Sequence, residues 1–392
     1  MKIVHVMIAA FYKEGYGYQE NIMPAKHLMF GHDVTILTYD RYNVYADYEA
    51  DDKGLKKYNN DKGVKVIVLP DNDSRLRKMH LWIFALCVNK TKYLYDTLCS
   101  ESPDVIFVHG ILSSDHSKIV KYKKKHPMVR VYLDNHADYY NSPIKTLRQW
   151  LTRKVLGRWY VRRMAAVCER VWGVTPWRVD YLREIYGLRE PKLGLLVMGG
   201  DEQLINWNER KNIRYSFRQQ HGIPQEAFVV VAGGKIDKTK NIHLLIDAVK
   251  SIDNPLLYLV VFGNFSEDLK KYAEQKHPRI ITLGWMKADS VYDIFLSSDL
   301  GAFPGTHSVL WEQACASGLP CIFKDWNGGF RHVDLGGNCI FIQEITIASL
   351  TEAIKNLLSD KKHYANMQHV AEQKCRKEFA YNEIAKRAIE LE

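Results

Sequence analysis

The sequence lacks the cysteine patterns that indicate disulfides or metal sites, because its seven cysteines are scattered without paired spacings. It also lacks any apolar run near the ~20 residues that a membrane-spanning helix needs. The apolar start, MKIVHVMIAAF, is followed by no small-residue cleavage pattern, which favours a first strand over a signal peptide. These absences predict buried free thiols in a reducing compartment, and we expect a cytoplasmic protein.

Positive charge, in contrast, is in excess, with a formal net charge of +10. Such a balance indicates an anionic partner, which is nucleic acid, anionic lipid or a phosphorylated substrate. The charge alone does not choose among these three.

Short runs rich in β-branched residues alternate with longer amphipathic runs in both halves of the 392 residues. This alternation predicts an α/β protein with a parallel, doubly wound sheet in each half. The expected strands lie within residues 2–10, 32–40, 64–70, 103–110, 130–136, 170–176, 228–234, 256–264, 279–285, 300–305, 320–326 and 339–343. The expected helices lie within residues 19–30, 82–99, 243–252, 291–298, 309–317, 349–360 and 381–392.

The stretch 195–224 is more polar and irregular, so we place the junction between two domains there. The expected architecture is two Rossmann-like domains that face each other across a cleft. In such sheets ligands bind at the carboxyl ends of the strands, where loops lead into helix N-termini.

One such loop is in FPGTHSVLWEQACASGLPCIF, residues 303–323. A turn of small residues, 304–308, precedes the expected helix, whose free N–H groups suit a phosphate. Glu312 repels phosphate but accepts well from a vicinal diol such as that of ribose. The alternative is a capped helix whose glutamate interacts favourably with the helix dipole.

A second loop, GGKIDKTKN at residues 233–241, also follows a strand and places Lys235, Lys238 and Lys240 beside a glycine turn. Two ammonium groups at a strand end suit a pyrophosphate. The alternative is a solvated basic loop. Two phosphate-suited turns in one expected domain favour a diphosphate ligand.

The first half offers two weaker candidates. GYGYQEN at 15–21 is half of a dinucleotide fingerprint without its third glycine, and it could simply let a loop approach a ligand closely. In LDNHADYYNS at 133–142, His136 stands between Asp134 and Asp138, where an imidazole can donate a hydrogen bond or act as acid or base. With one imidazole this cluster is a poor metal site, and we interpret His109 as structural.

These segments, in their order, resemble a retaining glycosyltransferase of family 4, which has the GT-B fold. The resemblance covers nearly the whole chain. It is carried by GYGYQEN, GHDVTILT, DNHAD, GVTPWRVDYLREIYG, MGGDEQL, GGKIDKTKNIHLLIDAV, VVFGN, LGW and SDLGAFPG…WEQACASGLPCIF…NGG. It implies an acceptor-binding Rossmann-like domain at 1–200, a nucleotide-sugar-binding Rossmann-like domain at 201–378, and a C-terminal helix at 379–392 that packs back towards the first domain.

The resemblance also implies residue roles. Lys235 stands where an arginine is usual, and with Lys240 it would neutralise the donor diphosphate. Glu312 would bind ribose hydroxyls, and His136 would lie near the donor sugar and the attacking acceptor; these four are the expected catalytic residues. The remaining expected donor-binding residues are Gly15, Tyr16, Gly17, Gly234, Trp285, Met286, Gly305, Thr306, His307 and Ser308, with the backbone at Trp285 and Met286 on the nucleobase and residues 305–308 on the phosphates.

One position departs from the family pattern, because the first glutamate of its paired-glutamate motif would lie at Pro304. That carboxylate contacts the donor sugar in the family, so the sugar is left open, and His307 is a candidate substitute. Two lysines and helix N–H groups can stabilise the leaving diphosphate, so we expect no metal and no other cofactor. The polar DND at residues 71–73 is not interpreted as a metal site.

The expected reaction is transfer, with retention, from a UDP- or GDP-sugar to a hydroxyl of a glycan or polyprenyl-linked lipid acceptor, in polysaccharide or glycolipid assembly. The segment 144–170 carries eight lysines and arginines among leucines and tryptophans, and 74–90 is similar. This composition suits the inner face of an anionic cell membrane, although core helices with basic rims explain it equally well. The alternatives are a non-catalytic nucleotide-sugar sensor and a GT-B epimerase; nucleic-acid binding fits the charge but not the two phosphate turns.

Overall fold

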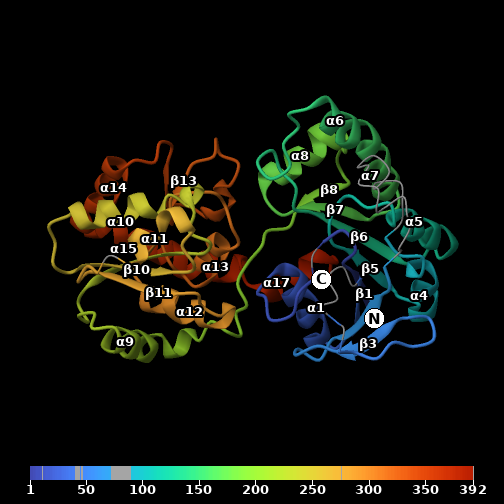
Figure 1. Cartoon of the computed structure of the whole chain (residues 1–392), viewed down its shortest axis with the longest axis horizontal. Coiled ribbons are helices and arrows are strands. Elements are labelled where there is room, and N and C mark those ends of the chain that lie inside the picture. Colours follow the sequence, from blue (N-terminus) through green and yellow to red (C-terminus); the bar gives the residue numbers. More distant parts are fainter. Residues whose placement is uncertain (11, 40–44, 46, 72–89, 275, 392) are drawn as a thin grey trace. The chain divides into compact units, whose positions relative to one another are not determined.

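The structure, a computed structural model, describes residues 1–10, 12–39, 45, 47–71, 90–274 and 276–391 (Figure 1). The chain forms two compact units. Unit 1 comprises Met1–Val197 and Ala385–Glu392, and unit 2 comprises Met198–Ile384. The sequence predicts the two domain junctions at 200/201 and 378/379, whereas the units divide at 197/198 and 384/385.

Unit 1 is an eight-stranded sheet in the order β3-β4-β2-β1-β5-β6-β7-β8, parallel except for the pairing of β3 with β4. Its strands are β1 Lys2–Val6, β2 Asp33–Tyr39, β3 Lys56–Asn59, β4 Lys65–Leu69, β5 Val105–Val108, β6 Arg130–Asn135, β7 Arg170–Gly173 and β8 Leu193–Leu195. Its helices are α1 Gln19–Met29, α4 Leu94–Glu101, α5 His116–Lys125, α6 Leu147–Trp150, α7 Arg158–Ala165 and α8 Pro176–Tyr186, with a π-helical turn at Leu151–Gly157 that joins α6 to α7.

Unit 2 is a six-stranded parallel sheet in the order β11-β10-β9-β12-β13-β14. Its strands are β9 Phe228–Gly233, β10 Leu257–Phe262, β11 Ile280–Gly284, β12 Leu300–Phe303, β13 Cys321–Lys324 and β14 Cys339–Ile342. Its helices are α9 Arg210–Gln220, α10 Ile242–Ser251, α11 Lys270–Glu274, α12 Ala288–Ser297, α13 Leu310–Ala316, α14 Ile347–Ser359, α15 Lys361–Val370 and α16 Arg376–Glu378. The central strands β9, β10 and β12 are buried except for partly buried Phe228 and Tyr258, as expected for a sheet covered on both faces.

The last helix, α17 (Tyr381–Ala388), carries the chain into unit 1. There, Trp172 Nε1 donates to the Ala388 carbonyl at 3.0 Å, and the Tyr132 hydroxyl donates to the Ile389 carbonyl at 3.1 Å. Arg170 pairs with Glu390 at 2.7 Å. The C-terminal segment is therefore part of the unit 1 core.

The two-domain parallel α/β prediction is confirmed, and each of the twelve expected strand ranges contains a strand. Three local predictions were incomplete. The stretch 195–224, expected to be irregular, contains α9, whose apolar side chains are sparse and whose Arg218 is buried against Asp299 at 2.8 Å. The edge strands β3 and β8 were not predicted. β3 is a short polar run, KKYN, and β8 is a three-residue strand with a central glycine, LGL.

Some predictions lie outside the described residues, namely nearly all of the basic segment 74–90, two residues of the DND and the first part of the helix expected at 82–99. The described cysteines Cys99, Cys168, Cys315, Cys321, Cys339 and Cys375 are free thiols. Among the described residues, no helix combines the length and the hydropathy needed to cross a bilayer.

Candidate active site

In unit 2 the two predicted phosphate turns lie against each other. Lys240 Nζ donates to the Thr306 carbonyl at 2.6 Å, and the Thr306 N–H donates to the Thr239 carbonyl at 3.1 Å. Asn241 Nδ2 donates to the Pro304 carbonyl at 3.0 Å. The contact needs glycine at 305, since a Cβ there would lie 2.3 Å from the Lys240 Cα. The loop after β9 and the loop after β12 therefore form one structure.

Lys240 places a positive charge where the loops after β9 and β12 meet. Its side chain is half-buried, and burial lowers its pKa from 10.5 to about 8, partly offset by Asp237. An ammonium group that has lost part of its hydration binds an anion more strongly than an exposed one does. Lys235 is exposed at the mouth of the same loop, so the structure places both predicted lysines at one strand end.

Neighbouring strand ends complete the surface. Gly234, at φ +112°, follows β9, and its carbonyl would lie 1.8 Å from a Cβ at Gly263 after β10. Trp285 and Met286 follow β11, and the Trp285 side chain is 65% exposed. The predicted donor residues of unit 2 therefore lie along the carboxyl ends of β11, β10, β9 and β12, which are consecutive in the sheet.

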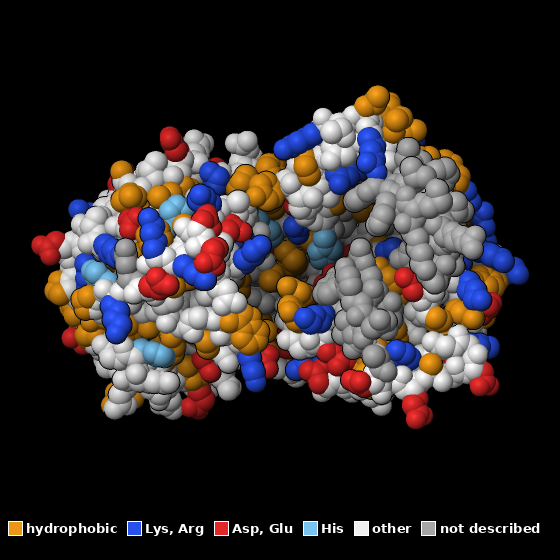
Figure 2. Space-filling view, viewed as in Figure 1, with side chains coloured by type: hydrophobic (Ala, Val, Ile, Leu, Met, Phe, Trp, Pro, Cys, Tyr) orange, Lys and Arg blue, Asp and Glu red, His pale blue; other side chains and the backbone are white. Residues whose placement is uncertain are grey.

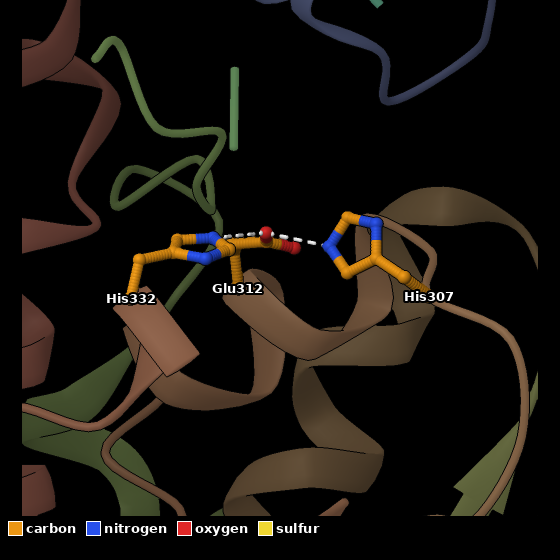
Figure 3. A group of neighbouring side chains, drawn as sticks. All are labelled: His307, Glu312 and His332. Atoms are coloured by element: carbon orange, nitrogen blue, oxygen red, sulfur yellow. Dashed lines mark hydrogen bonds and ion pairs between the residues drawn. The ribbon is translucent and has the colours of Figure 1, made fainter. Parts of the chain in front are cut away.

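Glu312 lies between two imidazoles (Figure 3). It is the third residue of α13. Its Oε1 accepts from His307 Nε2 at 2.8 Å and from His332 Nε2 at 2.9 Å. The His307 ring stacks on Phe330 with centroids 4.4 Å apart. His307 therefore contacts Glu312, the residue predicted to bind ribose hydroxyls.

Burial alone would raise the pKa of Glu312, but the charge and hydrogen bonds of His307 and His332 outweigh it and lower the pKa from 4.5 to about 2. The carboxylate is thus ionised, and its side chain has no exposed surface. Its Oε2 is buried and has no hydrogen-bond partner. A buried carboxylate oxygen without a donor costs free energy, which a hydroxyl donor would recover.

The same three side chains offer ligand atoms within 4.8 Å of one another, as a metal site would. However, Oε1 lies at hydrogen-bond distance between two imidazole donors, which satisfies the three atoms without an ion. The prediction of a site without metal stays a prediction.

In unit 1, His136 follows β6, and its Nε2 faces Asp134 Oδ2 at 3.5 Å. Burial by itself lowers the pKa of His136, but the charge of Asp134 outweighs it and raises the pKa above 6.5. The loop is fixed by Asn135, whose Nδ2 donates to the Arg178 carbonyl at 3.0 Å. Asp138 pairs with the Arg178 guanidinium at 3.1 Å. The His136 side chain remains about 30% exposed, so it is accessible from the strand ends.

The loop of Gly15, Tyr16 and Gly17 leads into α1 at the same end of the sheet. Gly15 adopts φ +74°, which glycine tolerates without strain. Gln19, the first residue of α1, donates from Nε2 to Asp134 Oδ2 at 3.4 Å. The predicted glycine loop is thus close in the chain to a residue that contacts the Asp134–His136 pair.

Sequence reasoning missed His332 and Trp326. Trp326 Nε1 donates to the Gly305 carbonyl at 3.1 Å and so anchors the phosphate turn from β13. The NGG motif that follows Trp326 was the available signal. His332 lies 20 residues beyond Glu312, on the 3-10 turn Arg331–Val333, with no pattern to link them.

Known proteins resemble part of this chain in sequence. Residues 213–374 match the family model of glycosyl transferases group 1. A curated relative, mannosylfructose-phosphate synthase from Agrobacterium fabrum, is 24% identical over 241 residues, which is 57% of this chain. The alignment spans about half (52%) of that relative's length.

Solved structures resemble the whole chain. A glycosyltransferase from Rickettsia africae has a TM-score of 0.71 at 14% identity and covers 100% of this chain and 97% of its own. HepE from Anabaena, solved with UDP and glucose, has a TM-score of 0.63 at 16% identity, with 100% and 98% coverage. At such identities the likeness establishes the fold. The chain therefore has a GT-B fold of two Rossmann-like domains, and the part of unit 2 at residues 213–374 matches the model of glycosyl transferases group 1.

Proposed function

We propose that the protein is a retaining glycosyltransferase that moves a sugar from a nucleoside-diphosphate sugar to a hydroxyl acceptor. The observation that carries this proposal is the contact between the two turns of unit 2, with Lys240 held between them. A cation and a glycine turn at adjacent strand ends suit a diphosphate, and the group 1 match covers this region. The solved relatives include structures with UDP, with UDP-glucose and with ADP and acarbose.

In this mechanism the residues of unit 2 hold the leaving group. Lys235 and Lys240 would neutralise the diphosphate as its bond to the anomeric carbon breaks, which is electrostatic stabilisation of developing charge. The acceptor hydroxyl would attack on the face from which the nucleotide departs, and a phosphate oxygen would take its proton. The protein then contributes positioning and charge rather than a nucleophile or a metal ion.

Glu312 and His307 would act at the sugar and ribose end. Oε1 of the ionised Glu312 accepts hydrogen bonds from the Nε2–H groups of His307 and His332, while its Oε2 has no hydrogen-bond donor. We propose that a ribose hydroxyl of the donor donates a hydrogen bond to Glu312 Oε2 after a small shift of α13. In unit 1, His136 is the candidate for contact with the donor sugar and the acceptor, because its pKa is raised and its side chain is partly exposed.

We also propose that unit 1 docks on an anionic lipid surface, where a lipid-linked acceptor resides. On α6, the π turn and α7, the exposed large apolar side chains Leu147, Trp150, Leu151, Val155 and Trp159 recur at helical spacing. Exposed basic side chains accompany them around α6, where blue and orange side chains lie side by side in Figure 2. The Arg163 guanidinium lies 4.4 Å from the Trp159 ring centroid. An exposed apolar stripe with basic residues suits the interface of an anionic bilayer.

Incubation of the full chain with a panel of UDP-, GDP- and ADP-sugars tests the enzyme proposal. A transferase binds one donor and releases its nucleoside diphosphate faster when acceptor is added. Donor binding without release identifies a sensor, and isomerised sugar without release identifies an epimerase; either result would overturn the proposal.

Liposome flotation tests the membrane proposal. We expect binding to vesicles with anionic lipid, weaker binding at high salt, and loss of binding in Trp150→Ser with Trp159→Ser. Equal flotation of the double variant and the wild type would contradict it.

A further inference from the structure

Unit 1 contains a continuous row of buried imidazoles that the proposed reaction does not use. His27 Nε2 lies 2.8 Å from the Ala385 carbonyl oxygen, and His27 Nδ1 lies 3.0 Å from His5 Nε2. His5 Nδ1 lies 3.0 Å from His109 Nε2. His109 Nδ1 lies 2.8 Å from Asp134 Oδ2. The row therefore runs from α17 through α1, β1 and β5 to β6, where it ends beside His136.

Each of these four contacts needs one proton. The carbonyl oxygen at one end is an acceptor only, so His27 must donate to it from Nε2. His27 Nδ1 then accepts from His5, and His5 Nδ1 accepts from His109. Three neutral imidazoles supply three N–H groups, and all three are used before Asp134 is reached. The fourth contact, between His109 and Asp134, requires one proton more.

The surroundings of Asp134 indicate where that proton resides. Its Oδ1 accepts the Gly110 N–H at 2.8 Å, and its Oδ2 accepts from Gln19 Nε2 at 3.4 Å. Both donors favour the ionised carboxylate. Burial alone would raise the pKa of Asp134, but His109 and His136 outweigh it and hold the pKa far below its ordinary value.

We propose that His109 is a buried imidazolium paired with ionised Asp134, that neutral His5 and His27 fix its orientation, and that His109 and Asp134 are positioning residues for His136. The last part rests on the proposed function, whereas the proton count does not. The residues His5, His27 and His109 are each 0% exposed, so the whole row is buried.

The neighbours of the row are consistent with this distribution of charge. Burial lowers the pKa of His5 well below 6.5 and that of His27 to about 4, and Asp134 and the Ala385 carbonyl only partly offset this. Both rings are therefore neutral at physiological pH. The other titratable or charged groups that face the row or His136 are His32 beside His27, and Glu20 and Arg178 beside His136. Phe107 packs against His5 and His109.

This arrangement gives His136 a fixed partner. The carboxylate of Asp134 cannot rotate, since its two oxygens are held by a backbone N–H and by an imidazolium. His136 Nε2 therefore faces a negative charge of fixed position, which favours the protonated form of His136.

Nitrogen NMR of ¹⁵N-histidine-labelled full chain, without substrate, tests the proton count at pH 7.5. We expect both ring nitrogens of His109 to carry protons, while His5 and His27 each have a bare Nδ1. In Asp134→Asn the side-chain amide can donate to His109, so His109 should become neutral with a bare Nδ1. A bare ring nitrogen on His109 in the wild type would overturn the proposal, whatever the variant does.

The positioning role is tested by the titration of His136 and by kinetics. Asp134→Asn should lower the pKa of His136, whereas Asp138→Asn, whose carboxylate faces Arg178, should lower it less. With a donor that the wild type turns over, Asp134→Asn should lower kcat about 10²-fold and leave the donor KM within about threefold. Unchanged kcat in a folded Asp134→Asn protein overturns the positioning role. Absence of turnover by the wild type overturns the proposed function instead, and the NMR result stands apart from it.

Discussion

Each unit contains a buried carboxylate between histidines, and the two sites differ in how completely their atoms are paired. In unit 1, Asp134 accepts from a backbone N–H and from His109, and the row beyond His109 ends on the Ala385 carbonyl. In unit 2, Glu312 Oε1 accepts from two imidazoles, while Oε2 has no partner. The first network is closed and suits a fixed role. In the second network Glu312 Oε2 lacks a hydrogen-bond donor, which suits a site where a ligand supplies that donor.

The largest expected effect comes from the cation beside the open network. Lys240→Ala should lower the turnover rate about 10²- to 10³-fold, because the leaving diphosphate loses its half-buried positive charge. Steady-state kinetics measure it. The matched control is Lys238→Ala, whose exposed ammonium pairs with Asp268 at 3.3 Å, and it should change turnover less than threefold. Equal losses in the two variants would refute a specific role for Lys240.

The comparison becomes sharper when the two carboxylates are removed separately. Glu312→Ala should weaken nucleoside-diphosphate binding about tenfold, which corresponds to one hydrogen bond to a charged acceptor. Asp134→Asn should leave this affinity unchanged, because it belongs to the closed network of unit 1. Calorimetry measures both, and circular dichroism checks that each variant is folded. Equal affinity of the wild type and Glu312→Ala would count against the assignment of Glu312.

A pH series tests Lys240 in a different way. Its pKa is lowered to about 8, so the free protein loses this charge as the pH rises through 8. Affinity for nucleoside diphosphate should therefore be constant from pH 6.5 to 7.5 and fall up to about tenfold per pH unit above 8. The Lys240→Ala variant should show a flat profile over the same range. A wild-type profile that is flat to pH 9.5 would contradict a role for this ammonium group.

A further prediction concerns stability. The folded-state pKa of Glu312 is lowered from 4.5 to about 2, so its ionised form stabilises the fold. For a lowered carboxyl pKa, this contribution is complete above pH 4.5 and is lost as the pH falls towards 2. The difference in unfolding free energy between the wild type and Glu312→Gln should thus be larger at pH 7 than at pH 3. Urea unfolding measures it, and a difference independent of pH would contradict it.

The fold could be predicted from the sequence because buried parallel strands are short apolar runs, which differ clearly from the amphipathic helical runs between them. The sequence also predicted a turn after β9 and a turn after β12, and the structure brings the two into contact, while their phosphate role stays a prediction. Glu312 was predicted as a candidate from its place after the second turn. Its burial was not, because it depends on His307 and His332, which reach it from separate loops.

The histidine row was unreadable from the sequence for a physical reason. His5 lies in β1, His109 directly follows β5, and His27 lies in α1. The acceptor Ala385 lies 358 residues beyond His27. Only the order β1-β5-β6 and the return of the C-terminal segment bring these groups into contact. A single histidine in an apolar run is interpreted as structural, as His109 was here, and its proton state follows from neighbours that the sequence does not reveal.

Nucleotide release from the full chain is the measurement that tests the central claim most directly. The chain should bind one sugar donor from a panel of UDP-, GDP- and ADP-sugars and release its nucleoside diphosphate, with release slowed about 10²- to 10³-fold in Lys240→Ala and retained in Lys238→Ala. Binding of no donor, or release that is unchanged in Lys240→Ala, would contradict the claim that the turns of unit 2 form a donor-diphosphate site.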